Sequence, residues 1–85
     1  MKFEWDENKR QLNIKKHGID FIDVQNIFYN EPFIITSKQT HLEKRFIALG
    51  KIANIPIAVI FIIRNEKIRI ISARKARTNE RKYIQ

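Results

Sequence analysis

The sequence has 85 residues, of which 44% are hydrophobic and 31% are charged, with a net charge of +8 and no cysteine. This length supports one domain with a modest hydrophobic core, and the lack of cysteine excludes disulfides and thiolate metal sites. The longest apolar stretch, residues 55–63, contains Pro56 and is too short to cross a membrane as a helix. We therefore expect one soluble, cytoplasmic domain over residues 1–85, without a signal peptide or a membrane span.

The positive charge is concentrated in the second half of the chain. Residues 1–42 carry six Lys or Arg and six Asp or Glu, whereas residues 43–85 carry eleven Lys or Arg and three Glu. Such an asymmetry indicates a polyanionic partner, with nucleic acid favoured over an acidic protein or an anionic membrane. The alternative is a charge that serves only solubility, which does not require the cations to be concentrated in one half.

Capping residues divide the N-terminal part of the chain into short elements. The alternation of polar and apolar residues over 2–5 predicts a strand, and Asp6 is a favourable N-cap for a helix that Gly18 ends. Asp20 is a second N-cap, and the apolar spacing over residues 21–28 predicts an amphipathic helix. We therefore expect one strand followed by two helices.

The pattern then changes to four runs rich in β-branched residues, at residues 33–37, 45–49, 57–63 and 67–73. The short polar links between these runs favour antiparallel hairpins, and the run at 57–63, apolar on both faces, is the predicted central strand. The last dozen residues are typical of a short helix. The sequence thus predicts a single small α+β domain of order β-α-α-β-β-β-β-α, with a mainly antiparallel sheet and the helices packed on one face.

The last predicted strand has one cationic face and one apolar face. Side-chain alternation places Lys67, Arg69 and Ile71 on one face and Ile68, Ile70 and Ser72 on the other. We expect Arg69 to be structural or to pair with an acid. The predicted RNA contacts are six basic residues of the second half of the chain and one tryptophan: Arg45, Lys67, Arg69, Lys75, Arg81, Lys82 and Trp5. The alternative for Trp5 is a place in the core.

The arginines after this strand predict a phosphate site. If a helix begins just beyond the strand, Arg74, Arg77 and Arg81 lie on one side of it, and Glu80 pairs with a neighbouring arginine. A guanidinium is always charged and donates to two phosphate oxygens at once. We expect Arg64, which follows the central strand, to converge with Arg74 and Arg77 on one scissile phosphate, with Arg74 at the N-terminus of the helix. The alternative is a solvated helix face with Arg–Glu pairs.

The residue types present exclude several kinds of enzyme. Two glycines provide no Gly-rich nucleotide-binding loop, and His17 and His41 have no neighbouring cluster of metal ligands. RNA cleavage requires neither, because the 2′-hydroxyl of RNA can attack the adjacent phosphate if the protein supplies a base, an acid and cations. His17 and Tyr83 are the candidates for proton transfer, although His17 also suits a helix C-terminus and Tyr83 a packing role. We expect no metal ion and no other cofactor.

Several of these residues form a pattern that resembles a known family. The N-terminal pattern WDxxKxxxNxxKHG, over residues 5–18, and the element RIISAR, over residues 69–74, are specific in combination. The sequence resembles the BrnT toxins of bacterial type II toxin–antitoxin pairs from residue 3 to residue 83. Further positions that carry the resemblance are Phe21, Phe28, Arg45, Gly50, Glu80, Arg81 and Tyr83.

This resemblance implies a RelE-like fold and a ribonuclease that inhibits translation. It also implies a BrnA-like ribbon-helix-helix antitoxin, which neutralises the toxin and binds operator DNA, so that the toxin reaches DNA only through its partner. Because ribbon-helix-helix proteins are dimers, we expect a hetero-oligomer with two toxins. Two alternatives stay open: a non-catalytic basic nucleic-acid-binding module, and a basic surface that only receives an acidic partner.

Overall fold

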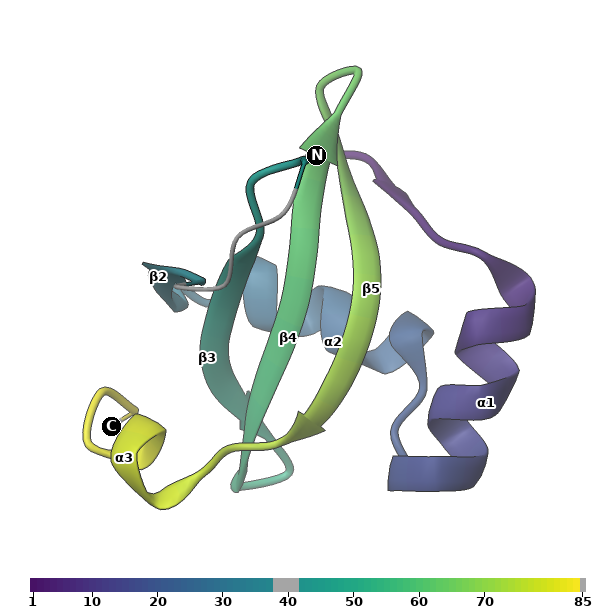
Figure 1. The fold of residues 1–85 in the computed structure, drawn as a ribbon. Helices are drawn as coiled ribbons and strands as arrows, with labels where there is room; N and C mark the ends of the chain where they lie inside the picture. Colours follow the sequence, from purple (N-terminus) through teal and green to yellow (C-terminus); the bar gives the residue numbers. More distant parts are fainter. Residues whose placement is uncertain (38–41, 85) are drawn as a thin grey trace.

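The computed structural model describes residues 1–37 and 42–84 and confirms the predicted α+β class and element order (Figure 1). His41 therefore lies outside the described residues. In chain order, the elements are β1 (Phe3–Glu4), α1 (Glu7–His17), α2 (Phe21–Phe28), β2 (Phe33–Thr36), β3 (Phe46–Ile52), β4 (Ile55–Arg64), β5 (Lys67–Lys75) and α3 (Thr78–Arg81).

The strands form one sheet in the order β1-β5-β4-β3-β2, with antiparallel pairing except between β1 and β5. β4 is therefore the central strand, as its two apolar faces predict. The β3–β4 hairpin turns at Ala53 and Asn54, and the β4–β5 hairpin turns at Asn65 and Glu66, all of which have positive φ. Two-residue turns of this conformation match the right-handed twist of the strands, so strand pairing continues up to the turn. β3 and β4 therefore extend further toward their shared turn than the sequence predicts.

The core lies between α2 and one face of the sheet. α2 buries Phe21, Val24 and Ile27 because these side chains recur on one side of the helix. They pack against inward-facing side chains of the three central strands, which include Ala48, Val59, Phe61, Ile70 and Ala73. Each large apolar side chain that is buried in this way contributes about 1.5–3 kcal/mol to stability.

α1 begins and ends where its capping residues predict. The Asp6 carboxylate accepts hydrogen bonds from the N–H groups of Asn8 and Lys9, and Gly18 ends the helix at a φ of 70°. α1 lies along β5 (Figure 1). The short β1 pairs with β5 only near the beginning of β5. Within the described residues, no helix is long and apolar enough to cross a membrane.

A β-bulge at Ile71 interrupts the side-chain alternation of β5. Ile60 of β4 pairs with Ser72, but the next residue, Phe61, pairs with Ile70. Ile71 is therefore an extra residue in β5 without a partner in β4. Every side chain of β5 after the bulge consequently points to the face opposite to the one that simple alternation predicts.

The bulge moves Arg74 to the sheet face opposite α2, which we call the open face. Ala73 faces the core, so Arg74 lies on the open face beside Ile47 and Ile60. The prediction that Arg74 begins a helix is wrong, because β5 continues beyond it and α3 begins only at Thr78. The expected packing on one face holds for α2, which covers the core, whereas α3 lies next to the open face (Figure 1).

Candidate nucleic-acid interface

Two hollows adjoin on the open face, and both gather cations from elements that are far apart in the sequence. The lower hollow, with a volume of about 680 Å³, lies between the open face and α3, and its lining side chains include Arg45, Ser72, Arg74, Arg77, Lys82 and Tyr83. The upper hollow, with a volume of about 440 Å³, lies toward the β4–β5 turn, and its lining side chains include Lys9, Glu43, Arg45, Arg64 and Arg69. The two hollows meet at Arg45 and Ile71.

Three cations of the lower hollow are available to an anionic ligand. Arg45, Arg77 and Lys82 form no side-chain ion pair with another described residue. Arg45 directly precedes β3, whereas Arg77 and Lys82 lie at the two ends of α3. The fold thus brings unpaired positive charge from two parts of the chain to one hollow, which favours the binding of a phosphate.

Arg74 is held in the lower hollow by a bidentate ion pair. Its Nη1 and Nη2 donate to the two carboxylate oxygens of Glu80 at 2.7 and 2.9 Å, and the Glu80 side chain is only 7% exposed. The backbone N–H of Arg77 donates to the same carboxylate at 2.8 Å, so Glu80 also fixes the beginning of α3. The hydrogen bond from Arg74 is the main reason that the pKa of Glu80 lies below its ordinary value. The predicted pairing of Glu80 with a neighbouring arginine is confirmed.

Asn13 of α1 supports β5 at the residue that precedes Arg74. Its Nδ2 donates to the carbonyl of Ala73 at 2.9 Å, and its Oδ1 accepts from the N–H of Ala73 at 3.1 Å. Nδ2 also donates to the carbonyl of Ile19 at 2.9 Å, and the Ser72 hydroxyl donates to Oδ1 at 3.4 Å. Sequence reasoning missed this role, although Asn13 is the asparagine of the N-terminal pattern WDxxKxxxNxxKHG.

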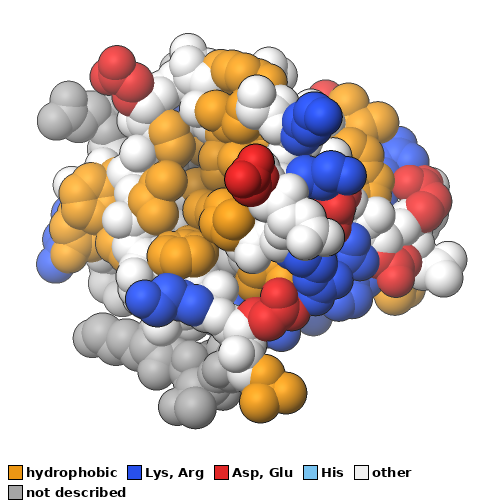
Figure 2. Space-filling model, turned by 90° about the horizontal axis from the view of Figure 1, so that it is seen from above, with side chains coloured by type: hydrophobic (Ala, Val, Ile, Leu, Met, Phe, Trp, Pro, Cys, Tyr) orange, Lys and Arg blue, Asp and Glu red, His pale blue; other side chains and the backbone are white. Residues whose placement is uncertain are grey.

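Two arginines of the upper hollow, Arg64 and Arg69, are paired with carboxylates, whereas Lys9 and Arg45 form no ion pair with another described residue. Arg64 pairs with Glu43, and its hydrogen bond is the main reason that the pKa of the Glu43 carboxyl lies below its ordinary value. Arg69 donates to Glu4 at 2.9 Å, and Lys67 lies 3.9 Å from the same side chain. Figure 2, a view onto the end with the β4–β5 turn, shows Lys and Arg side chains interspersed with Asp and Glu side chains, beside a hydrophobic area. The prediction that Arg69 pairs with an acid is confirmed.

The predicted convergence of three arginines is wrong for Arg64. The pairing of β4 with β5 places Arg64 opposite Lys67 and Arg74 opposite Ala58, near the two ends of the hairpin. At about 3.3 Å per residue, the two positions in β4 are roughly 20 Å apart. Arg74 and Arg77 do meet, in the lower hollow.

The candidates for proton transfer lie in two different hollows. Tyr83 lines the lower hollow together with Lys82, whereas His17 lines a hollow on α1 that meets the lower hollow at Ile71 and Ser72. Four predicted RNA contacts line neither hollow of the open face: Trp5, Lys67, Lys75 and Arg81. Among residues 1–37 and 42–84, no three or more His, Asp or Glu side chains form a group that could hold a metal ion.

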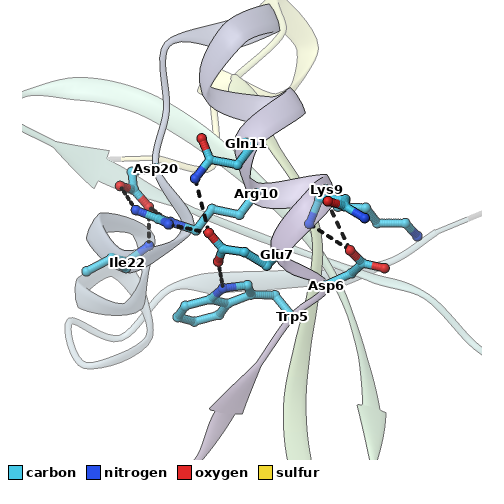
Figure 3. A network of polar contacts seen from close by, with 9 residues as sticks. Trp5, Asp6, Glu7, Lys9, Arg10, Gln11, Asp20 and Ile22 are labelled. Carbon is cyan, nitrogen blue, oxygen red and sulfur yellow. Dashed lines mark hydrogen bonds and ion pairs between the residues drawn. The ribbon is translucent and has the colours of Figure 1, made fainter.

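Trp5 lies on the core side of the molecule and not at the open face. Its ring packs edge to face on Phe21, with centroids 6.2 Å apart, and its Nε1 donates to Glu7 at 3.4 Å. Arg10 joins Glu7 to Asp20, to which it donates at 2.8 and 2.9 Å (Figure 3). The hydrogen bond from Arg10 is the main cause that lowers the pKa of Asp20. This network fixes the start of α1 against α2, which supports the core alternative for Trp5.

Two comparisons with known proteins identify the family. A family model described as "Ribonuclease toxin, BrnT, of type II toxin-antitoxin system" matches residues 5–80. The crystal structure of the Brucella abortus ribonuclease toxin BrnT is 40% identical in sequence and has a TM-score of 0.72, covering 92% of this chain and 99% of that chain. No curated protein matches the sequence. From the extent of the family match and this likeness of fold, it follows that the chain belongs to the BrnT family of ribonuclease toxins of type II toxin–antitoxin systems.

Proposed function

We propose that the protein is an active endoribonuclease that cleaves RNA in the lower hollow without a metal ion. The observation that carries this proposal is the set of cations without ion pairs that surrounds one hollow next to Arg74 and Tyr83. Membership of a ribonuclease family supports it. The 2′-hydroxyl of the RNA is the nucleophile, so the protein has only to position the RNA, transfer protons and offset negative charge.

Cleavage begins when the 2′-oxygen attacks the adjacent phosphorus. The O2′–P bond forms as the P–O5′ bond breaks, which leaves a 2′,3′-cyclic phosphate and a free 5′-hydroxyl. Arg45, Arg77 and Lys82 offset the negative charge that develops on the non-bridging oxygens. Arg74 contributes its remaining N–H groups, since a guanidinium has five donors, of which two donate to the Glu80 carboxylate and one to the carbonyl of Lys75.

The two proton transfers are assigned to Tyr83 and His17. Tyr83 lines the lower hollow, and its hydroxyl donates to the departing 5′-oxygen. His17, whose hollow meets the lower hollow at Ile71 and Ser72, accepts the proton of the 2′-hydroxyl. Tyr83→Phe and His17→Gln are each expected to slow cleavage by about 10²- to 10⁴-fold. A His17→Gln variant with full activity would remove His17 from the mechanism.

Cations beyond the lower hollow bind the RNA backbone on either side of the cleaved bond; these are Arg64, Lys67, Arg69, Lys75 and Arg81. Each phosphate contact on a single strand contributes about −0.7 to the slope of log K against log salt concentration. Affinity that hardly changes between low and moderate salt would instead indicate an apolar protein partner.

The partner that silences this activity is a BrnA-like ribbon-helix-helix antitoxin, in a hetero-oligomer with two toxins that reaches operator DNA through the antitoxin. Silencing requires acidic or apolar segments over the cationic hollows. Because Arg64 and Arg74 lie roughly 20 Å apart along the hairpin, one extended segment of the antitoxin is needed to cover both. A complex that leaves Arg74 and Arg77 exposed would contradict this mode of inhibition.

The decisive experiment incubates the purified protein with RNA in the presence of a metal chelator. Cleavage that leaves 2′,3′-cyclic phosphate and 5′-hydroxyl ends supports the proposal. A gel shift without cleavage supports the alternative, a non-catalytic basic nucleic-acid-binding module, and neither result supports a surface that only receives an acidic partner. In cells, expression without the antitoxin is expected to stop translation, because the toxin cleaves RNA in the cytoplasm.

A further inference from the structure

Two aromatic rings stack on each other at the margin of the lower hollow. Phe33 of β2 and Tyr83, which follows α3, have ring centroids 4.5 Å apart and ring planes only 12° from parallel. Both rings stay substantially exposed, Phe33 at 45% and Tyr83 at 40%. By contrast, Phe21, Phe28 and Phe61 are buried in the core. The stacked pair is therefore an aromatic surface that faces solvent.

This aromatic pair joins two hollows. Tyr83 lines the lower hollow and also a neighbouring hollow of about 520 Å³, in which Phe33 and Lys51 take part. The ammonium of Lys82 lies 5.1 Å from the centroid of the Tyr83 ring. An anionic chain that leaves the arginines of the lower hollow on this side thus passes directly over aromatic rings with cations nearby.

We propose that an unpaired nucleobase next to the cleaved phosphate stacks on the Phe33–Tyr83 pair. This inference rests on the proposed function and adds the form of the substrate, which is single-stranded RNA. A base in a duplex already stacks on its neighbours, whereas an unpaired base is free to stack on an aromatic side chain. The combination of a cationic groove for the backbone with exposed rings for the bases is the usual design of single-strand binding sites. Because every base has a π-face, the site tolerates many sequences.

The charges around the pair agree with this occupant. Lys51 and Lys82 flank the rings, outnumber Glu31, which also lines the neighbouring hollow, and are placed to bind the phosphates on either side of the stacked base. A purely apolar ligand would gain nothing from these ammonium groups, and an acidic peptide would gain nothing specific from parallel rings. A strand of alternating phosphates and flat bases uses both.

The first experiment measures the binding of single-stranded oligonucleotides in which the 2′-hydroxyls are replaced by hydrogen, so that they bind without being cleaved. Phe33→Leu keeps an apolar side chain but removes the ring, and is expected to weaken binding by about 5- to 150-fold. Phe33→Tyr keeps the ring and is expected to bind within about twofold of the unchanged protein. Tyr29→Leu removes a 60% exposed ring away from this hollow and is the matched control.

The second experiment moves one abasic position along the oligonucleotide. At one position, the loss of the base is expected to weaken binding as much as Phe33→Leu does, with no further loss when both changes are combined. A fluorescent 2-aminopurine at that position is expected to be quenched on binding to the unchanged protein. This measurement does not depend on the folding of any variant.

Several results would overturn the proposal. The rings would have a structural role only if the Phe33→Leu variant bound the oligonucleotide as tightly as the unchanged protein does. The same would hold if Phe33→Leu lowered the affinity for intact and abasic strands equally. The same holds if 2-aminopurine keeps its full fluorescence at every position. If the unchanged protein nevertheless cleaves RNA, the proposed function stands and the stacking site alone fails. If it neither binds nor cleaves RNA, both fail.

Discussion

Asn13 and Ala73 form the pair of hydrogen bonds that a neighbouring strand would otherwise supply. The side-chain amide of Asn13 donates to the carbonyl of Ala73 at 2.9 Å and accepts from its N–H at 3.1 Å, although the two residues are 60 positions apart. Within the described residues, Asn13 and Glu80 are the buried polar side chains. One holds Ala73 and the other holds Arg74, so both fix β5 where it enters the lower hollow.

Asn13→Ala is expected to destabilise the protein by about 2–4 kcal/mol. The change leaves the buried N–H and carbonyl of Ala73 without partners, and each such group costs about 1–3 kcal/mol. Urea unfolding followed by circular dichroism measures the effect. Asn26→Ala is the matched control, because Asn26 is on the exposed side of α2 and bonds only locally. Equal stabilities of the two variants would contradict the role of Asn13.

Arg74→Ala is expected to slow RNA cleavage by about 10²- to 10³-fold, by analogy with the removal of one donor to a developing oxyanion. The single change also leaves the buried carboxylate of Glu80 without its partner, so it lowers stability as well. The double variant Arg74→Ala/Glu80→Gln is therefore expected to regain stability but not activity. Arg69→Ala, which removes a cation paired with Glu4, is expected to change the rate much less.

Cleavage assays and thermal melts of these variants separate catalysis from folding. Full activity in a folded Arg74→Ala protein would exclude Arg74 from the site. Recovery of activity in the double variant would show that Arg74 acts only by neutralising Glu80.

Glu80 is expected to make the stability of the protein depend on acidity. Its folded-state pKa lies below the ordinary value of 4.5, so the unfolded chain binds a proton first as the pH falls. The stabilisation is complete above pH 4.5 and is lost as the pH falls through the folded-state pKa. Glu80→Gln is expected to flatten this part of the profile by up to about 1.4 kcal/mol per pH unit. The exposed Glu66 provides the control Glu66→Gln, since Glu66 forms no ion pair with a described residue.

Gly50→Ala is expected to destabilise the protein by about 1–3 kcal/mol through overpacking. A Cβ at this position in β3 would lie 2.8 Å from Cγ2 of Ile27, a buried β-branched side chain that has little freedom to move. Because Ile27→Ala removes the clashing atoms, the double variant is expected to lose less stability than the sum of the two single changes. Strict additivity of the three unfolding free energies would contradict the contact.

Glu66→Gly is expected to stabilise the β4–β5 hairpin by about 1 kcal/mol. Glu66 has a φ of 64°, a conformation that costs about 1–2 kcal/mol for most residues and nothing for glycine, although glycine loses more entropy on folding. The change also creates Asn-Gly, the preferred pair for this turn. The midpoint of thermal unfolding should rise by about 4–8 °C. Asn54→Gly, at the equivalent position of the β3–β4 turn, should gain less, because asparagine already tolerates positive φ.

Local signals predict much of this fold. Asp6, Gly18 and Asp20 act within one helical turn of themselves, so the helix ends could be read directly from the sequence. The central position of β4 follows from its two apolar faces. The pairing of Glu80 with an arginine required only two charges close together in the chain.

The placement of Arg74 could not be predicted in the same way. It depends on the extra residue Ile71, which is visible only in the pairing with β4. It also depends on Asn13, whose hydrogen bonds to Ala73 cross most of the chain. Alternation within β5 alone therefore assigns the wrong face, and the arginines that meet differ from those expected.

The pairing of β1 with β5 has a consequence for the synthesis of the protein. Phe3 pairs with Ile68, so β1 cannot join the sheet until the chain has been synthesised beyond Ile68. Contacts between such distant positions form late and slowly, because the intervening chain must first be ordered. Tyr83 and Arg77 emerge after even these partners. A nascent chain that has not yet emerged from the ribosome as far as Tyr83 therefore lacks the lower hollow and cannot cleave RNA there.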